Sequence, residues 1–186
     1  WLLTRSLTFL DPTEKLKFFR TEIETRPGQP GGFLCRRKKM NVQDLMKALH
    51  TAEQLKDTLR HCDTSGGRRE SVAEHSWRVS LMAYWISDEF PEADMNKVIK
   101  MCLIHDLGEC FTGDIPTFDK TKADEQREEQ LLQEWVDQLP SPFREEMTAL
   151  YQEMEARETV EAKIYKALDN LEAVIQHNES DICFGH

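Results

Sequence analysis

The feature that most constrains the fold is a helical repeat of apolar residues that runs from Met40 almost to the C-terminus. In its first segment, Val42, Leu45, Met46 and Leu49 recur three or four residues apart, which is the spacing of one face of an amphipathic helix. From Met40 on, no run of alternating apolar and polar residues is long enough to predict a β-strand. The chain is therefore expected to be all-α.

Five further helices are expected, separated by segments that contain Gly, Pro, Asp or Ser. They span residues 72–90, 96–109, 122–139, 143–157 and 159–177. Ser71 with Glu74 forms a capping box at the start of the first of them. Residues 60–67 and 111–119 are expected to be loops, because they carry turn-forming residues and no apolar repeat.

Composition limits the compartment and the partners. The 186-residue chain has 34 Asp and Glu against 24 Lys and Arg, a net charge of −10. An acidic body repels a phosphate backbone, so duplex nucleic acid is not an expected partner. No apolar run reaches the ~18–20 residues that a membrane span needs, so no membrane association is expected. The five cysteines form no CxxC pair, which favours a reducing, cytoplasmic compartment.

Residues 1–40 form a basic N-terminal segment that differs from the rest of the chain. It contains a Gly- and Pro-rich stretch at residues 26–32 and a basic run at residues 35–39, directly before Met40. The basic run is compatible with a flexible arm, with a signal for localisation or for an anionic surface, or with a translated ribosome-binding site. Our hypothesis is the last, with Met40 as the natural start, and we assign the folded domain to residues 41–186.

Ionisable residues occupy positions where packing favours apolar side chains. His75 lies in the first turn of an expected helix, His105 and Asp106 follow an apolar run, and Asp169 lies within an apolar helical stripe. A buried carboxylate without a partner costs several kcal/mol, so these groups need a cation or a hydrogen-bond network. Imidazole and carboxylate together suit divalent ions such as Mn, Fe, Co, Zn or Mg. Glu109, one helical turn beyond His105, is expected to reach a metal-bound water or a second ion.

Each of these residues also has an ordinary structural explanation. His75 could cap a helix, and Asp169 could pair with Lys166 three residues earlier. Glu109 could be a solvated helix end, and Asp114 an ordinary turn residue beside a glycine. The combination, rather than any one residue, favours a metal site.

The combination resembles the H…HD…D pattern of the HD-domain metal-dependent phosphohydrolases. Three longer segments, ESVAEHS at residues 70–76, IHDLGE at 104–109 and TGDIPT at 112–117, look like the 5′-deoxynucleotidase branch of that superfamily. The resemblance covers residues 41–180, including the order and spacing of the motifs. It implies an HD-domain helical bundle with a buried divalent-metal site.

The resemblance also implies roles for individual residues. The implied metal ligands are His75, His105, Asp106 and Asp169. Glu109 and Asp114 correspond to catalytic acids that assist the attacking water or hold a second ion. The implied substrate-binding residues are Arg60, His61, Arg68, Ile115 and Thr117, with Arg60 contacting the phosphate and Ile115 contributing its backbone carbonyl.

The activity implied by the resemblance is release of phosphate from (deoxy)nucleoside 5′-monophosphates by a metal-activated water, with Mn, Co, Mg, Zn or Fe as the ion. His61 stands where bacterial deoxynucleotidases carry a tryptophan, so strict selectivity for deoxyribose is not implied. A homodimer is implied, and family members often extend beyond residue 186, so the C-terminus of the domain is expected to be truncated. Two alternatives stay open: a phosphodiesterase or pyrophosphohydrolase acting on another nucleotide, and a non-catalytic metal-binding regulatory module.

Overall fold

The computed structural model describes residues 40–116 and 118–180. The chain divides into two units, residues 1–47 and residues 48–186, and the candidate site lies entirely in the second. The expectations for the basic N-terminal segment, for Thr117 and for the C-terminal end lie outside the described residues and stay predictions.

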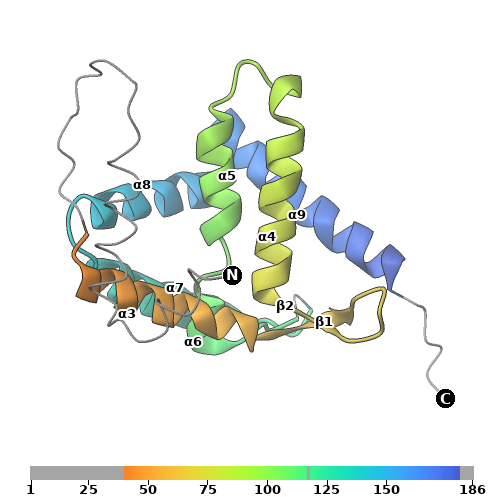
Figure 1. Ribbon diagram of the computed structural model, residues 1–186, viewed down its shortest axis with the longest axis horizontal. Coiled ribbons are helices and arrows are strands. Elements are labelled where there is room, and N and C mark those ends of the chain that lie inside the picture. Colours follow the sequence, from red (N-terminus) through yellow and green to blue (C-terminus); the bar gives the residue numbers. More distant parts are fainter. Residues whose placement is uncertain (1–39, 117, 181–186) are drawn as a thin grey trace, which may run out of the picture. The chain divides into compact units, whose positions relative to one another are not determined.

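Most of the described chain is helical (Figure 1), as the apolar repeat predicts. In order, the elements are α3 (Val42–Glu53), a 3-10 turn (Gln54–Lys56), β1 (Leu59–Asp63), β2 (Arg69–Ser71), α4 (Val72–Trp85), a second 3-10 turn (Ser87–Glu89), α5 (Met95–Ile104), α6 (Glu109–Thr112), α7 (Lys122–Asp137), α8 (Phe143–Ala156) and α9 (Val160–Glu179). No helix within the described ranges combines the length and the apolar character that crossing a bilayer requires.

Helices α4, α5 and α9 pack around the main hydrophobic core. Figure 1 shows α4 and α5 side by side, with α9 passing across both, and all three pairs are in contact. Each helix contributes the apolar residues of one face, such as Val79 from α4, Met101 from α5 and Leu168 from α9. Leu150 and Met154 of α8 complete this core. The three central helices also carry the ionisable residues that the sequence singles out.

A second cluster of buried residues holds the segment after α5 in place. Leu107 packs with Leu55 and Val72, and Leu132 and Trp135 of α7 cover them. This cluster fixes the chain immediately after His105 and Asp106.

A short β-hairpin replaces the loop expected over residues 60–67. Strands β1 and β2 pair antiparallel, with Leu59 opposite Ser71 and Asp63 opposite Arg69. The connecting turn uses Gly67 at φ 78°, a left-handed conformation that glycine adopts without a steric penalty. Strands of five and three residues are too short to show an alternating pattern, so the sequence did not predict them. The all-α class is nevertheless confirmed, because this hairpin is the one sheet in the described part of the chain.

The helix expected over residues 96–109 ends early. Helix α5 stops at Ile104, residues 105–108 form a turn, and α6 begins at Glu109. The turn lets Leu107 enter the second cluster and brings Gly108 against α7, where a Cβ atom at position 108 would lie 2.8 Å from Cγ of Glu128. The prediction that His105, Asp106 and Glu109 share one helix is therefore wrong. His105 and Asp106 lie in the turn that follows α5.

Candidate metal centre

His75 is placed by the start of α4. The predicted capping box is present: the Ser71 hydroxyl accepts a hydrogen bond from the Glu74 amide, and the Glu74 carboxylate accepts one from the Ser71 amide. The box fixes where the helix begins, and thereby directs His75, in the first turn, toward α9. His75 is 1% exposed. Its Nδ1 lies 2.5 Å from Oε2 of Glu172 on α9, which leaves its Nε2 atom facing the interior of the site.

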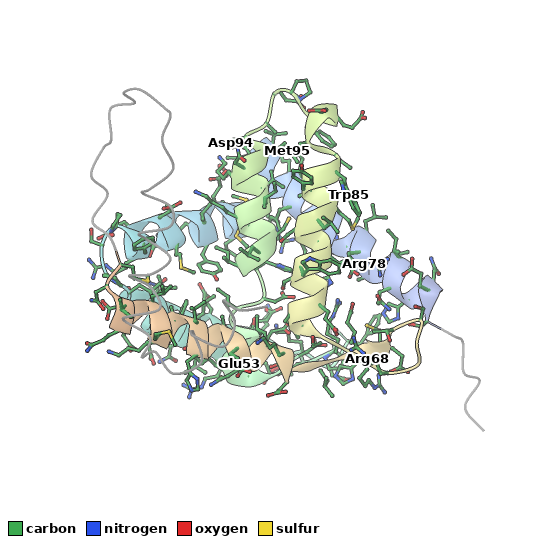
Figure 2. The ribbon with its side chains drawn as sticks, in the orientation of Figure 1. Glu53, Arg68, Arg78, Trp85, Asp94 and Met95 are labelled. Carbon is green, nitrogen blue, oxygen red and sulfur yellow. The ribbon has the colours of Figure 1, made fainter. Side chains whose placement is uncertain are left out.

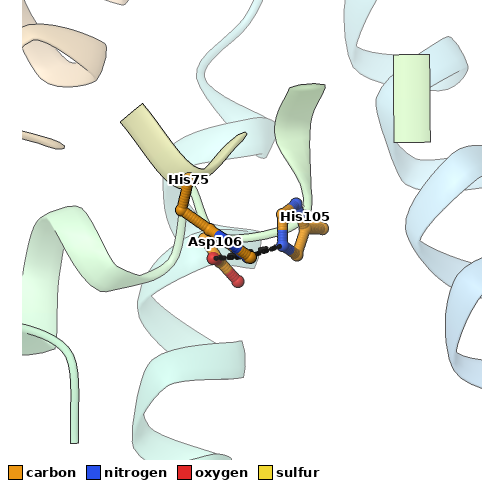
Figure 3. Close-up of side chains that lie close together, drawn as sticks. All are labelled: His75, His105 and Asp106. Atoms are coloured by element: carbon orange, nitrogen blue, oxygen red, sulfur yellow. Dashed lines mark hydrogen bonds and ion pairs between the residues drawn. The ribbon is translucent and has the colours of Figure 1, made fainter. Parts of the chain in front are cut away.

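His105 and Asp106 approach the same point from the end of α5. The His105 Nδ1–H donates a hydrogen bond to the Cys102 carbonyl at 2.8 Å, so its Nε2 atom is directed away from its own helix. Figure 3 shows His75, His105 and Asp106 pointing toward one another. The Nε2 atoms of the two histidines are 3.3 Å apart.

Four donor atoms converge at this point. The Nε2 atom of His75 lies 3.7 Å from Oδ2 of Asp106 and 3.1 Å from Oδ1 of Asp169, and the Nε2 atom of His105 lies 3.1 Å and 3.5 Å from the same oxygens. Nitrogen and oxygen ligands bind an ion such as Zn²⁺ at about 2.0–2.2 Å, which puts neighbouring ligand atoms roughly 3–3.5 Å from each other. The donor atoms of His75, His105 and Asp106 all lie within 4.8 Å of one another, so this group fits a divalent ion, and Oδ1 of Asp169 lies beside both histidines.

The electrostatics of the cluster favour a positive charge at its centre. Burial acts to lower the pKa of His105, but the adjacent Asp106 carboxylate outweighs it and raises that pKa to about 10. Burial acts in the opposite direction on Asp169, yet hydrogen bonds from His105 and His75 lower its pKa. The two half-buried carboxylates of Asp106 and Asp169 thus attract a proton to the imidazoles, and a divalent cation would be attracted in the same way.

Asp169 has two different partners, one for each oxygen. Oδ1 faces the histidines, and Oδ2 pairs with Nζ of Lys166 at 2.6 Å. Asp169 therefore forms the expected ion pair with Lys166 and also directs an oxygen toward the two histidines.

Glu109 and Asp114 lie beside the cluster on less regular structure. Glu109 opens α6, and its Oε2 atom is buried without a hydrogen-bond partner. Burial, and then the nearby carboxylates of Asp106, Asp114 and Glu128, raise the pKa of Glu109 to about 9, although Lys120 opposes this. Asp114 follows Gly113, whose φ of 77° ends α6.

Glu128 brings α7 to this acidic edge. Its carboxylate accepts hydrogen bonds from Lys120 at 2.7 Å and from the Thr112 hydroxyl at 3.3 Å. The α7 face around Glu128 is therefore turned toward α6 rather than fully toward solvent.

The substrate-binding residues that the resemblance implies are not all brought together. The His61 Nε2–H donates to the Asp114 carbonyl at 3.2 Å, which joins the hairpin to the acidic edge. Arg60 Nη1 lies 3.1 Å from Oε2 of Glu70 and 3.4 Å from Oε2 of Glu172.

Arg68 lies elsewhere in the described structure. It pairs with Glu74 at 2.5 Å on the exposed side of the hairpin, where Figure 2 labels it. It lines an open groove of about 370 Å³ together with Lys56, Leu59, Ser71, Ala73, Glu74 and Trp77. None of the four proposed metal ligands lines that groove. Ile115 is half-buried, and Thr117 lies outside the described residues.

Sequence reasoning missed two buried carboxylates next to the site. Glu172 is fully buried and Glu70 is 2% exposed. For Glu172 a signal was available: it follows Asp169 by three residues and Leu168 by four, which places it on the apolar face of α9. For Glu70, on a three-residue strand, no periodicity marked the buried side.

Comparisons with known proteins agree with this geometry. Residues 52–182 match the family profile of the HD domain. The chain is 34% identical over 114 residues to 5′-deoxynucleotidase HDDC2 of Homo sapiens and 38% identical over 112 residues to that of Danio rerio. These matches cover 60% and 59% of this chain and 55% of each relative, so the chain spans about half the length of those relatives.

One solved structure is similar in both fold and sequence. It is described as a predicted metal-dependent phosphohydrolase from Magnetospirillum magnetotacticum MS-1, with a TM-score of 0.67 and 33% identity over 74% of this chain and 71% of that one. The family profile covers well over half of this chain, and the order H…HD…D is kept within it. The chain belongs to the HD-domain family.

Proposed function

We propose that this chain is a metal-dependent phosphohydrolase that releases phosphate from (deoxy)nucleoside 5′-monophosphates. The observation that carries the proposal is that the Nε2 atoms of His75 and His105 lie 3.3 Å from each other and 3.1–3.7 Å from one oxygen each of Asp106 and Asp169, beside Oε2 of Glu109, which has no hydrogen-bond partner among the described residues. The relatives from Homo sapiens and Danio rerio support the substrate class, because both are 5′-deoxynucleotidases.

The metal ligands in this proposal are His75, His105, Asp106 and Asp169. A divalent ion held there would supply a bound water whose pKa falls from 15.7 toward about 7, which makes a nucleophile available at neutral pH. Two imidazole nitrogens and two carboxylate oxygens accept Mn, Fe, Co, Zn or Mg, so availability would decide among them. Glu109 and Asp114 would hold a second ion if one binds.

Glu109 is proposed to accept a proton from the attacking water. Its Oε2 atom has no partner within the described residues, so it is free to receive a hydrogen bond from a substrate or a water. Positive charge in the adjacent cluster would lower the raised pKa of Glu109 and make it a base at neutral pH. Asp114, whose position is tied to the hairpin through His61, would orient the same water.

Arg60 is proposed to bind the phosphate. A guanidinium group has five N–H donors in a planar fork, and the two buried carboxylates contact only Nη1. The remaining donors can neutralise charge on the phosphoryl oxygens, which is where phosphoryl transfer needs electrostatic help. His61, Arg68, Ile115 and Thr117 are kept as proposed substrate contacts. A homodimer and a cytoplasmic location stay predictions.

Two alternatives predict different behaviour. Another phosphoester substrate would use the same residues on a diester or a polyphosphate. A regulatory module would bind the ion without turnover, but such a module has no use for the buried, unpartnered carboxylate of Glu109, whose desolvation is unfavourable. This carboxylate favours the enzyme.

The test is phosphate release from a panel of ribonucleoside and deoxynucleoside 5′-monophosphates, with Mn, Co, Mg or Zn. Asp106→Ala serves as the inactive control, and Asp88→Ala, an exposed aspartate after α4, as the matched control that keeps activity. Release from deoxy substrates alone supports a deoxynucleotidase, and release from both supports a role for His61 in relaxed selectivity. No release by protein that binds metal would overturn the proposal in favour of the two alternatives.

A further inference from the structure

Glu172 is a fully buried carboxylate on the core-facing side of α9. Its relative exposure is 0%, and its neighbours on the same face, Tyr165 and Leu168, belong to the main core. Burying a carboxylate is unfavourable unless it is paired, and apolar residues of similar volume often stabilise a core better. Packing alone therefore gives no reason for a glutamate at this position.

The contacts of Glu172 are concentrated on one oxygen. Oε2 lies 2.5 Å from Nδ1 of His75 and 3.4 Å from Nη1 of Arg60. Oε1 lies 3.6 Å from Nη1 of Arg78 and makes no hydrogen bond. Oε2 of Glu172 thus contacts both His75, a proposed metal ligand, and Arg60, the residue proposed to bind the phosphate.

The contact with His75 determines which ring nitrogen faces the metal cluster. When Nδ1–H of the neutral ring donates to the Glu172 carboxylate, the lone pair is on Nε2, which faces the side of Asp106 and Asp169 and would be available to an ion held there. His105 achieves the same orientation with a main-chain carbonyl, that of Cys102. A carboxylate partner fixes the ring orientation and raises the basicity of the ligating nitrogen as well.

The contact with Arg60 ties the hairpin to the same point. Arg60 lies on β1, and its Nη1 atom lies between Oε2 of Glu172 and Oε2 of Glu70. Glu70 is itself held by the Cys62 thiol, which donates to it at 3.2 Å. The arginine therefore has one nitrogen fixed between two buried carboxylates, while the rest of the guanidinium is left for another partner.

From this geometry we propose that Glu172 is a positioning residue that orients His75 for the metal and Arg60 for the phosphate through one shared oxygen. The inference rests on the proposed function for the roles of those two partners. Metal binding and phosphate binding then both depend on the Glu172 carboxylate, and removing it weakens both.

The first test is the affinity of the purified, metal-free chain for Mn²⁺ or Zn²⁺ alone, measured by titration calorimetry. Glu172→Gln keeps the shape and removes the charge, and we expect its affinity to fall by about 10- to 100-fold. Glu179→Gln is the matched control, because it removes a charge from the same helix and a partner of Arg78 at 2.7 Å without touching His75. Its affinity should equal that of the unsubstituted chain.

Two readouts separate positioning from a merely structural role. In the zinc-loaded chain, the ¹⁵N shifts of His75 should report a protonated Nδ1 in a strong hydrogen bond, and this signature should weaken in Glu172→Gln while that of His105 is unchanged. At metal concentrations that saturate each variant, inorganic phosphate should bind several-fold more weakly to Glu172→Gln than to Glu179→Gln.

Further variants keep the test decisive if Glu172→Gln does not fold. Glu172→Asp keeps the charge but retracts it from His75, so its metal affinity should also fall. Arg78→Gln removes the other neighbouring charge and should leave metal affinity unchanged. Unaltered affinity in both Glu172 variants, or an equal loss in Arg78→Gln, would overturn the positioning role alone. If the unsubstituted chain binds no divalent ion, the proposed function fails with it.

Discussion

The four proposed metal ligands and the two acids beside them are held in different ways. The ligands come from α4, from the turn after α5 and from α9. These three helices share the main core, and the donor atoms already face one another. Glu109 and Asp114 come from the four-residue α6 and the loop after it, and the Glu109 carboxylate has an oxygen with no partner. The proposed metal ligands (the metal side) thus already lie together, whereas on the side of the two acids (the acid side) the Glu109 carboxylate is left to be paired by what binds.

The largest effect is expected on the metal side. Asp106→Asn removes the charge that lies 3.1 Å from Nε2 of His105 and leaves Asp169 as the one carboxylate among the four proposed ligands. We expect loss of measurable metal binding and a fall in kcat/KM of at least about 10³-fold. Metal content by mass spectrometry and phosphate release measure the two effects. Full metal content in Asp106→Asn would contradict the assignment of the ligands.

Glu109→Gln tests the acid side, with an expected loss in kcat of about 10²-fold. Its metal-free form should also show a changed pH dependence of stability. The pKa of Glu109 is about 9 in the folded chain against an ordinary value of 4.5, so the folded state keeps a proton that the unfolded state has released. The free energy of unfolding should therefore fall as pH rises from 4.5 to 9.

The comparison between the two chains isolates this contribution, because His105 titrates in both. The free energy of unfolding of the metal-free proteins should be measured by urea unfolding at several pH values. Its decrease with rising pH should be shallower in Glu109→Gln, by an amount that corresponds to at most one bound proton. Equal slopes in the two proteins would mean that Glu109 is ionised in the folded state, and would remove the reason for treating it as a base poised by its surroundings.

Arg60→Lys probes the junction between the two sides. Lysine keeps the charge but loses the planar fork, so it cannot bind Glu70, Glu172 and a phosphate in the same way. We expect KM for a nucleoside monophosphate to rise by about 10-fold, with a smaller change in kcat. Steady-state kinetics at saturating metal distinguish this from a loss of the ion. An unchanged KM would place the phosphate elsewhere.

The smallest effect is expected from the helix caps. Ser71→Ala and Thr121→Ala each remove one capping box, at α4 and at α7, and each should lower the free energy of unfolding by about 1 kcal/mol. Only Ser71→Ala should weaken metal affinity, by a few-fold, because α4 carries His75. Thermal unfolding and metal titration of both variants provide the comparison. Equal metal affinity in both would show that His75 is held by α9 alone.

The convergence of His75, His105, Asp106 and Asp169 is the part of the candidate site that the sequence indicates most clearly. Apolar residues three and four apart mark the core faces of α4, α5 and α9; His75 and Asp169 lie among those of α4 and α9, and His105 and Asp106 directly follow those of α5, which makes all four visible in the sequence. The buried polar partners of these residues, such as Glu172, are harder to predict from the sequence. A glutamate on a helix is ordinarily solvated, so although its spacing from Leu168 places Glu172 on the apolar face of α9, its partners His75 and Arg60 depend on how α9 packs on α4 and β1, which local pattern does not encode.

The positions of Glu109 and Asp114 were harder to predict, because short helices and strands show no repeating pattern of apolar residues. The sequence predicts that Glu109 follows His105 by one helical turn, but the chain leaves the helix at Ile104 to bury Leu107 and to bring Gly108 against Glu128. The hairpin that joins His61 to Asp114 likewise depends on pairing across a turn. These are tertiary effects that override local propensity.

The two oxygens of Asp169 have a consequence for reactivity. Since Oδ2 is held by Lys166 at 2.6 Å, only Oδ1 is available to an ion, and the carboxylate can act as a monodentate ligand but not as a chelating one. Ions such as Mg²⁺ take about six ligands, and four single-atom donors leave such an ion coordinatively unsaturated. By holding Oδ2 of Asp169, Lys166 would leave coordination positions of the ion open for a water and a phosphate oxygen. It would do so without contacting the substrate.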